Sequence, residues 1–205
     1  MTLKDIRIGF AMTGSFCTFE AALSDLNELA QAGAKITPIL SFAAASTGTR
    51  FGKAEDLIKN LRVICGAEPI ITIEDAEPIG PQKLLDALVV HPCTGNSLAK
   101  IANAITDTPV TMAVKAHLRN ARPVILGIST NDGLGANLKN IGMLMAMKNV
   151  YFVPFYQDNP TEKPRSLVAN GRLIPQTVEA ALKGQQVQPI IDTDLIKTMP
   201  REPGV

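Results

Sequence analysis

Small polar residues gather at one point of the sequence, between a predicted buried strand and a predicted helix. Residues 86–90 form a short apolar run that is typical of a strand covered on both faces, and residues 98–105 carry apolar side chains at helical spacing. Between these two segments lie Thr94, Gly95, Asn96 and Ser97. They offer hydroxyl groups, an amide and the free backbone N–H groups of a helix start, which together favour an anion. We therefore expect a cofactor-binding loop here.

Two other predicted strands end in residues of the same kind. Thr13, Gly14 and Ser15 follow the first apolar run of the chain, and Ser41 follows the second. Helix capping explains each of these groups equally well when it is taken alone, because Ser and Thr are common N-caps. In an open parallel sheet, however, the carboxyl ends of the strands lie at one edge, where ligands bind. Three such strand ends would form one crevice suited to the phosphate of a mononucleotide.

The sequence does not indicate a nicotinamide or nucleoside triphosphate site. The P-loop pattern GxxxxGK[ST] does not occur. Gly133-Leu134-Gly135 follows a predicted strand, but Leu138 stands where the GxGxxG pattern has its third glycine. A glycine-rich loop before a helix is the simpler interpretation.

Candidates for acid–base or nucleophilic chemistry are few. The two histidines are His91, directly before the polar loop, and His117, whose apolar helix is typical of a packed side chain. Cys93 has no adjacent base, so we interpret it as a small buried residue rather than a nucleophile. On a late polar loop, Lys163 and Arg165 could meet an acidic substrate, although a solvated loop is the simpler interpretation.

Strands that alternate with helices predict a single α/β domain over residues 1–205, with a three-layer, doubly wound parallel sheet of the flavodoxin or Rossmann type. Strands are expected at residues 6–12, 35–40, 69–73, 86–90, 122–128 and 150–155. Helices are expected at about 19–33, 53–65, 98–105, 109–118, 136–148 and 175–183. A polar, proline-rich flap is expected at about 157–170, and a weakly ordered tail at about 190–205.

The composition excludes several classes of partner. The chain has 205 residues, of which 46% are hydrophobic and 4% aromatic, and its net charge is +1. The apolar content predicts a thick α/β sandwich or surface buried between subunits. A near-neutral charge without a basic cluster argues against nucleic acid and membranes as partners. Three scattered cysteines indicate neither disulfides nor zinc, and no bilayer-length apolar run or signal peptide is present, so we expect a cytoplasmic protein without a metal site.

The segment Pro92–Lys100 resembles the PASANT-type motif of the homo-oligomeric flavin-containing cysteine decarboxylase superfamily, and the resemblance extends over about residues 5–155. It implies trimers or dodecamers that bind FMN, with Asn96 facing the flavin or the reacting group. The residues that it assigns to FMN are Gly14, Ser15, Ser41, Thr94, Gly95, Asn96, Ser97 and Ser129. The decarboxylases carry a histidine in their first half, whereas no histidine precedes His91 here, and only Asn131 remains of their PxMN segment. An orthodox decarboxylase would need a base that the sequence does not show.

Residues 8–19 and 150–169 are similar to flavoprotein-like subunits of spore-forming bacteria that work with a separate dehydrogenase subunit. The resemblance implies formation of pyridine-2,6-dicarboxylate from a hydroxylated tetrahydrodipicolinate during sporulation, in the cytoplasm of the mother cell. NADP would lie on the dehydrogenase subunit. Candidates for binding the dicarboxylate substrate are Arg50, Lys53, Asn131 and Arg165. The alternative is a non-catalytic partner that keeps the fold and supports the dehydrogenase subunit.

Overall fold

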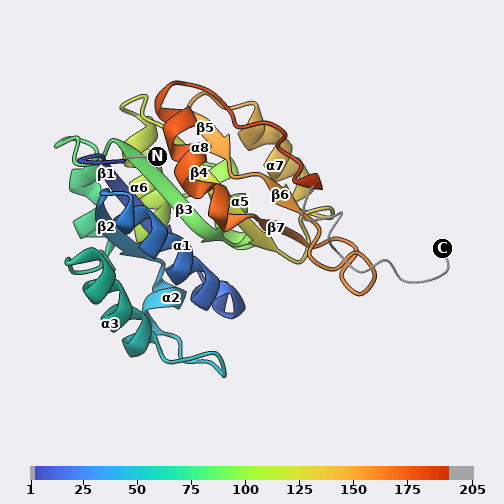
Figure 1. Cartoon of the computed structure of the whole chain (residues 1–205), viewed down its shortest axis with the longest axis horizontal. Coiled ribbons are helices and arrows are strands. Elements are labelled where there is room, and N and C mark those ends of the chain that lie inside the picture. Colours follow the sequence, from blue (N-terminus) through green and yellow to red (C-terminus); the bar gives the residue numbers. More distant parts are fainter. Residues whose placement is uncertain (1–2, 194–205) are drawn as a thin grey trace.

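The computed structural model describes residues 3–193, in which a seven-stranded sheet lies between two layers of helices (Figure 1). The strands are β1 (Arg7–Met12), β2 (Lys35–Leu40), β3 (Ala87–Cys93), β4 (Val124–Thr130), β5 (Val150–Phe152), β6 (Phe155–Tyr156) and β7 (Leu167–Ala169). The α-helices are α1 (Phe19–Gln31), α2 (Phe42–Ser46), α3 (Ala54–Cys65), α4 (Ile73–Ala76), α5 (Gly95–Ala102), α6 (Pro109–Leu118), α7 (Leu138–Met145) and α8 (Ile174–Leu182). Short 3-10 helices span Phe16–Thr18, Glu77–Ile79 and Gly171–Leu173.

The sheet has a parallel core in the order β2-β1-β3-β4-β5, which is the order of flavodoxin-like folds. The predicted α/β class and doubly wound architecture are therefore confirmed. One feature differs from the prediction, because the sheet is mixed. The first half of β4 pairs with β5, whereas Ser129 and Thr130 at its end pair antiparallel with β7, which in turn pairs antiparallel with β6.

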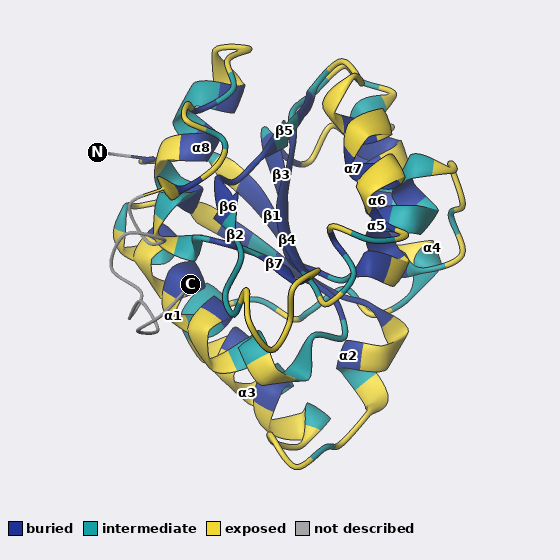
Figure 2. Ribbon diagram, turned by 90° about the vertical axis from the view of Figure 1, so that its right-hand side faces the viewer, coloured by how far each residue is buried: buried dark blue, intermediate teal, exposed yellow. Residues whose placement is uncertain are grey.

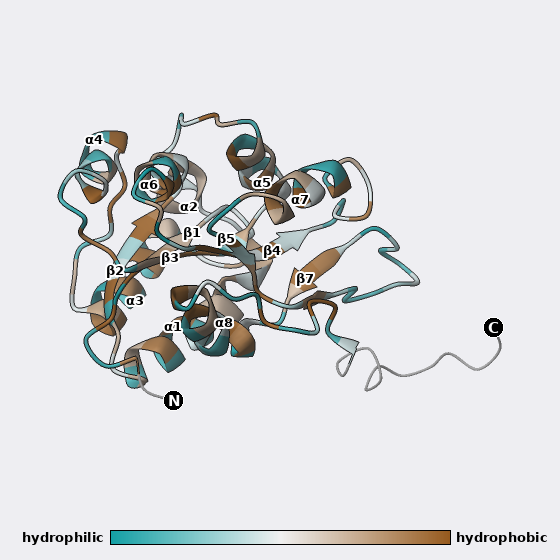
Figure 3. Cartoon of the chain, turned by 90° about the horizontal axis from the view of Figure 1, so that it is seen from above, coloured by the Kyte–Doolittle hydropathy of each residue, from teal (hydrophilic) through white to brown (hydrophobic). Residues whose placement is uncertain are grey.

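Helices cover both faces of the sheet (Figure 3). One face carries α1, α3 and α8, and the other carries α4, α5, α6 and α7. Every residue of β3 is buried, as its apolar run predicted, and the strands form the dark centre of Figure 2. Within residues 3–193, none of the helices combines the length and the apolar composition that crossing a bilayer requires.

The strand predicted at residues 69–73 is wrong. Only Ile70 pairs with the sheet, through a single bridge to Ile39, and the chain then turns into α4. The reason is a helix start, since the Thr72 hydroxyl accepts a hydrogen bond from the backbone N–H of Asp75 at 3.1 Å. This capping interaction outweighs the β-propensity of the Ile-Ile-Thr-Ile segment.

The end of the described chain is packed rather than loose. Ile191 forms a bridge to Phe155, and Asp192 accepts a hydrogen bond from the side chain of Asn170 at 2.8 Å. The predicted tail at about 190–205 begins with these residues, and its residues 194–205 lie outside the described part. The predicted flap at 157–170 contains β7, so its last residues belong to the sheet.

The buried histidine of α6 makes the folded protein sensitive to acid. Burial, and to a lesser extent the charge of Arg122, lowers the pKa of His117 from 6.5 to about 4. Between these values the unfolded chain binds a proton that the folded chain excludes, so the free energy of unfolding falls as the pH drops. The slope is at most about 1.4 kcal/mol per pH unit. Urea denaturation at pH 7 and pH 4.5 should show a smaller loss for His117→Gln than for the wild type, and equal losses would contradict this account.

Candidate functional site

The ends of three neighbouring strands are tied together by the Thr13 hydroxyl on one side of β1 and by the Met12 carbonyl on the other. Its Oγ1 donates to the carbonyl of Pro92 at 2.7 Å and accepts from the backbone N–H of Thr94 at 2.9 Å, so it joins β1 to the loop after β3. On the other side of β1, the N–H of Ser41 donates to the carbonyl of Met12 at 3.0 Å. The convergence that the sequence predicted is therefore present in the structure.

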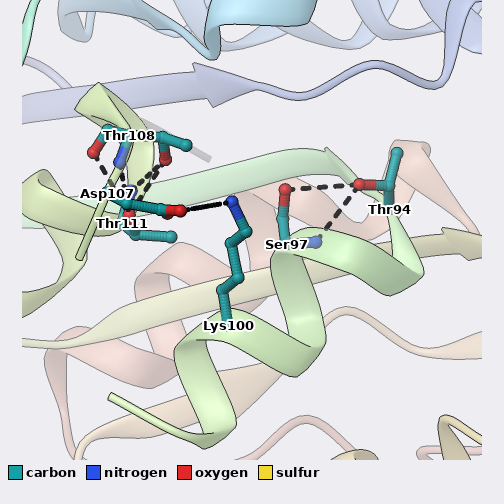
Figure 4. A network of polar contacts seen from close by, with 6 residues as sticks. All are labelled: Thr94, Ser97, Lys100, Asp107, Thr108 and Thr111. Atoms are coloured by element: carbon teal, nitrogen blue, oxygen red, sulfur yellow. Dashed lines mark hydrogen bonds and ion pairs between the residues drawn. The ribbon is translucent and has the colours of Figure 1, made fainter. Parts of the chain in front are cut away.

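Thr94 begins α5 in the manner that its residue type predicts. Its hydroxyl oxygen accepts from the backbone N–H of Ser97 at 3.4 Å and donates to the Ser97 hydroxyl at 3.2 Å (Figure 4). One turn later, the Lys100 ammonium group donates to both carboxylate oxygens of Asp107, at 2.9 and 2.8 Å. This ion pair holds the pKa of the Asp107 carboxyl below its ordinary value. The amino-terminal turns of α5 thus present hydroxyl groups and one ammonium group together.

A cavity of about 450 Å³, which we call the first cavity, opens at the ends of β1, β3 and β4. It contains six of the sequence-predicted site residues, which are Gly14, Ser15, Thr94, Gly95, Ser129 and Asn131. Its other lining residues are Phe16, Cys17, Thr18, Phe51, Thr130, Asp132, Asp158, Lys163, Ser166 and Val168. Across it, the hydroxyls of Ser15 and Ser129 hydrogen-bond at 2.9 Å, which links the start of the first helical segment to the end of β4.

The second cavity, of about 370 Å³, adjoins the first and shares Gly14 and Thr94 with it. Its other lining residues are Ser41, Phe42, Ala43, Asn96, Ser97, Lys100 and Thr108. All eight residues predicted to bind the cofactor therefore line one or the other of these two adjoining cavities. The second cavity differs in its lining, because Lys100 and several hydroxyl groups line it, and the Lys100 ammonium group is paired there with the Asp107 carboxylate.

A carboxylate that sequence reasoning did not single out lies beside the start of α5. Asp132 accepts hydrogen bonds from the Thr130 hydroxyl at 2.5 Å and from the Asn137 amide at 2.9 Å on both oxygens. The bond from Thr130, and then that from Asn137, holds the pKa of the Asp132 carboxyl below its ordinary value. A Cβ on Gly95 would lie 2.9 Å from Asp132 Oδ1, so the helix start and the carboxylate are in close proximity. An anion therefore fits the second cavity better than the first.

The three cations predicted to clamp a dicarboxylate are exposed, and none of them is among the residues that line the first or second cavity. The Arg50 guanidinium lies over the ring of Phe51, 4.8 Å from its centroid, while Lys53 and Arg165 face solvent. Lys163, from the same loop as Arg165, lines the first cavity with its ammonium group 3.8 Å from Asp158 Oδ2. Lys163 therefore lines the first cavity, whereas Arg50, Lys53 and Arg165 do not.

A third cavity, of about 200 Å³, adjoins the first cavity on the side of β6 and β7. It shares Thr18, Ser129 and Val168 with the first cavity, and its other lining residues are Ala21, Asp25, His91, Tyr156, Ala169, Asn170, Gly171 and Arg172. At its inner wall His91 Nε2 lies 3.0 Å from Asp25 Oδ2.

Sequence reasoning missed Asp25, although a signal was present. Asp25 lies on the same face of α1 as the buried Ala22, Leu26 and Leu29, and a carboxylate on an apolar helix face requires a partner. Cys93, by contrast, is fully buried, and burial raises the pKa of its thiol to about 12, so it remains protonated as the sequence interpretation required.

The strand order and the hydroxyl-lined cavities at the carboxyl ends of the strands define a flavodoxin-like α/β protein. The sequence profile of the flavoprotein family matches residues 1–168, and the chain belongs to this family. It is 52% identical to the B subunit of dipicolinate synthase from Bacillus subtilis (strain 168) over 190 residues, which cover 93% of this chain and 95% of that protein.

Solved structures agree with this assignment. The crystal structure of the dipicolinate synthase B subunit from Bacillus halodurans C superposes with a TM-score of 0.86 at 48% identity, covering 93% of this chain and 98% of that one. The FMN-dependent cysteine decarboxylase SpaF superposes with a TM-score of 0.67 at 18% identity, covering 89% and 99%. The first likeness confirms the resemblance seen in residues 8–19 and 150–169, and the second shows a shared fold.

The hydroxyl of Thr13 should be necessary for the stability of the site. In Thr13→Val the partly buried N–H of Thr94 loses its acceptor, so the free energy of unfolding should fall by about 1–3 kcal/mol. Thr47→Val, at the exposed end of α2, is the matched control and should stay within about 0.5 kcal/mol of the wild type. Urea denaturation of both variants measures the difference, and a loss in Thr13→Val no larger than in the control would refute the role.

Proposed function

We propose that this chain is the flavoprotein component, or B subunit, of a dipicolinate synthase. In this proposal it binds FMN and acts with the dehydrogenase component of that enzyme to convert a hydroxylated tetrahydrodipicolinate into pyridine-2,6-dicarboxylate during sporulation, in the mother-cell cytoplasm. The observation that carries the proposal is the pair of adjoining cavities at three strand ends, in a chain 52% identical to a dipicolinate synthase B subunit.

The residues present are suited to FMN. The phosphate would lie in the second cavity, where it would meet the hydroxyls of Ser41, Thr94, Ser97 and Thr108 and share the Lys100 ammonium group with Asp107. The first cavity, with Phe16 and Phe51, has a volume within the range of about 300–1,000 Å³ that is typical of small-molecule sites and suits the ring system. A bound flavin supplies an acceptor for the two hydrogens that aromatisation removes.

Polar residues around the two cavities have distinct proposed roles. Asn96 is exposed at the rim of the second cavity, and we assign its amide to the flavin or the reacting group. Asn131 lines the first cavity, where Lys163 is better placed to meet a carboxylate than Arg50, Lys53 or Arg165. These last three remain candidates from the sequence.

The dehydrogenase subunit would hold the NADP. Gly133 does not face a cavity for a dinucleotide, because a Cβ there would lie 2.8 Å from the side chain of Leu167. The glycine-rich segment therefore packs against β7. We further propose a homo-oligomer, a trimer or dodecamer, because Leu138, Met143 and Met145 of α7 are exposed apolar side chains.

The proposed function is tested by purifying the chain alone and with its dehydrogenase subunit, then assaying pyridine-2,6-dicarboxylate formation with and without added FMN. A yellow protein with flavin absorbance, and product formed only when both subunits are present, is the expected result. A colourless protein that cannot be reconstituted with FMN but still supports product formation would favour the alternative of a non-catalytic partner.

The position of the phosphate makes a separate prediction. Lys100→Gln should weaken FMN binding by roughly 10–100-fold, because a charge-assisted hydrogen bond contributes about 1.5–3 kcal/mol. Riboflavin, which lacks the phosphate, should bind wild type and variant equally. Lys59→Gln, an exposed lysine of α3, is the matched control. Quenching of flavin fluorescence measures both affinities, and an equal loss for riboflavin would show that Lys100 does not bind the phosphate.

A further inference from the structure

The Asp25–His91 pair is buried but borders a cavity. Only 6% of the His91 side chain and 12% of the Asp25 side chain are exposed. His91 Nε2 lies 3.0 Å from Asp25 Oδ2, and Nδ1 lies 3.4 Å from the carbonyl oxygen of Gly127. Burying two ionisable groups is costly, and most of the residues that fill this core are apolar. A buried ionisable pair at a cavity wall is a candidate for chemistry.

The two contacts of the imidazole orient the pair. The Gly127 carbonyl oxygen lies on its Nδ1 side and the Asp25 carboxyl oxygen on its Nε2 side. The Gly127 contact fixes the ring, and the ring in turn holds one oxygen of the Asp25 carboxyl in place. A carboxyl group held in this way beside a cavity can exchange a proton with a ligand there.

Two glycines leave room for the pair, one beside each of its members. A Cβ on Gly127 would overlap His91 Nδ1, and a Cβ on Gly171 would overlap the carboxylate of Asp25. Both overlaps are severe, so only glycine fits either position without displacing the pair. The backbone thus encloses the imidazole and the carboxylate and fixes them at the cavity wall.

The third cavity is an extension of the first rather than a separate ligand site. Its volume of about 200 Å³ is below the roughly 300–1,000 Å³ of typical small-molecule pockets. Ser129 lines both cavities and hydrogen-bonds Ser15 in the first at 2.9 Å. A ligand in the third cavity and the proposed flavin in the first would therefore both contact Ser129.

The groups at the third cavity favour a carboxylate. Arg172, an exposed residue on the 3-10 helix Gly171–Leu173, is among the lining residues, and a guanidinium suits bidentate binding of a carboxylate. The Tyr156 hydroxyl is the other donor on this side, while the Asn170 amide is engaged with Asp192 at 2.8 Å. Apart from the Asp25–His91 pair, Arg172 is the charged residue among those that line this cavity.

We propose that the third cavity is the substrate subsite, in which Arg172 binds one carboxylate of the cyclic dicarboxylate and Asp25 is the acid–base residue, positioned by His91. This rests on the proposed function. In the dehydration, Asp25 removes a proton from a ring carbon, and the C–H electron pair becomes a C=C bond. The hydroxyl on the neighbouring carbon then leaves as water with the proton that Asp25 returns. The pair ends with the protons it began with, and one water is released.

Binding tests the subsite without relying on turnover. Pyridine-2,6-dicarboxylate is titrated by calorimetry, in metal-free buffer with saturating FMN, into wild type, Arg172→Ala, Arg165→Ala and Arg119→Ala, the last an exposed arginine beyond α6. Arg172→Ala should lose at least tenfold in affinity, while the other two variants and the FMN affinities of all four proteins stay unchanged. A loss in Arg165→Ala instead of Arg172→Ala would place the dicarboxylate at the late loop and overturn the subsite.

Turnover tests the acid–base residue. In the complex with the dehydrogenase subunit, Asp25→Asn should lower kcat about a hundredfold or more, with KM and FMN affinity within about threefold of wild type. His91→Asn should lower kcat with the same pattern, and the double variant should lose no more than Asp25→Asn, since the two residues act as one unit. Full kcat in Asp25→Asn would overturn the role while leaving the proposed function intact. If the wild-type complex forms no product, the proposed function is contradicted. The calorimetric titration then tests the proposed subsite on its own.

Discussion

The buried hydroxyl of Thr13 is the constraint on which the site depends. Parallel strands bring their carboxyl ends to the same edge, but pairing alone does not fix the loops that follow. By donating to Pro92 and accepting from Thr94, this one side chain fixes the loop after β3 relative to the end of β1. Thr94 can then begin α5, and the hydroxyls of α5 meet Ser41 across the second cavity.

Charge is divided along the same edge of the sheet. Lys100 and a set of hydroxyls line the second cavity, whereas Asp132 lies on the first-cavity side of the α5 start. The amino terminus of α5 is the positive end of its dipole, and on the side of the first cavity it lies near the Asp132 carboxylate. On the side of the second cavity it is open to an anion. An elongated ligand with one anionic end would therefore bind in one orientation, with that end in the second cavity. Hydroxyl groups alone are neutral and would not favour one orientation over the other.

Most of the fold and half of the site could be predicted from the sequence. Buried runs such as 86–90 and the small polar residues after them specify strands and their ends locally, so the convergence of Ser15, Ser41 and Thr94 followed from parallel topology. The 69–73 segment failed because a single capping threonine decided between strand and helix. Asp25 carries a local signal, a carboxylate on an apolar helix face, but its partner His91 lies 66 positions away. Arg172 follows a hairpin whose antiparallel placement the alternating pattern does not indicate. Asp132 has nearby hydrogen-bond partners, but its place beside Gly95 depends on how the ends of two strands meet.

Because the end of β4 pairs with β7, a hairpin from late in the sequence lies beside the ends of strands from its first two thirds. The antiparallel hairpin of β6 and β7, and the segments around it, contribute Tyr156, Lys163 and Arg172 to the first and third cavities. Among the described residues, those that line the second cavity lie between positions 14 and 108. Changes in the last quarter of the coding sequence can therefore alter the walls of the first and third cavities without replacing a lining residue of the second. The two parts of the site are free to evolve separately.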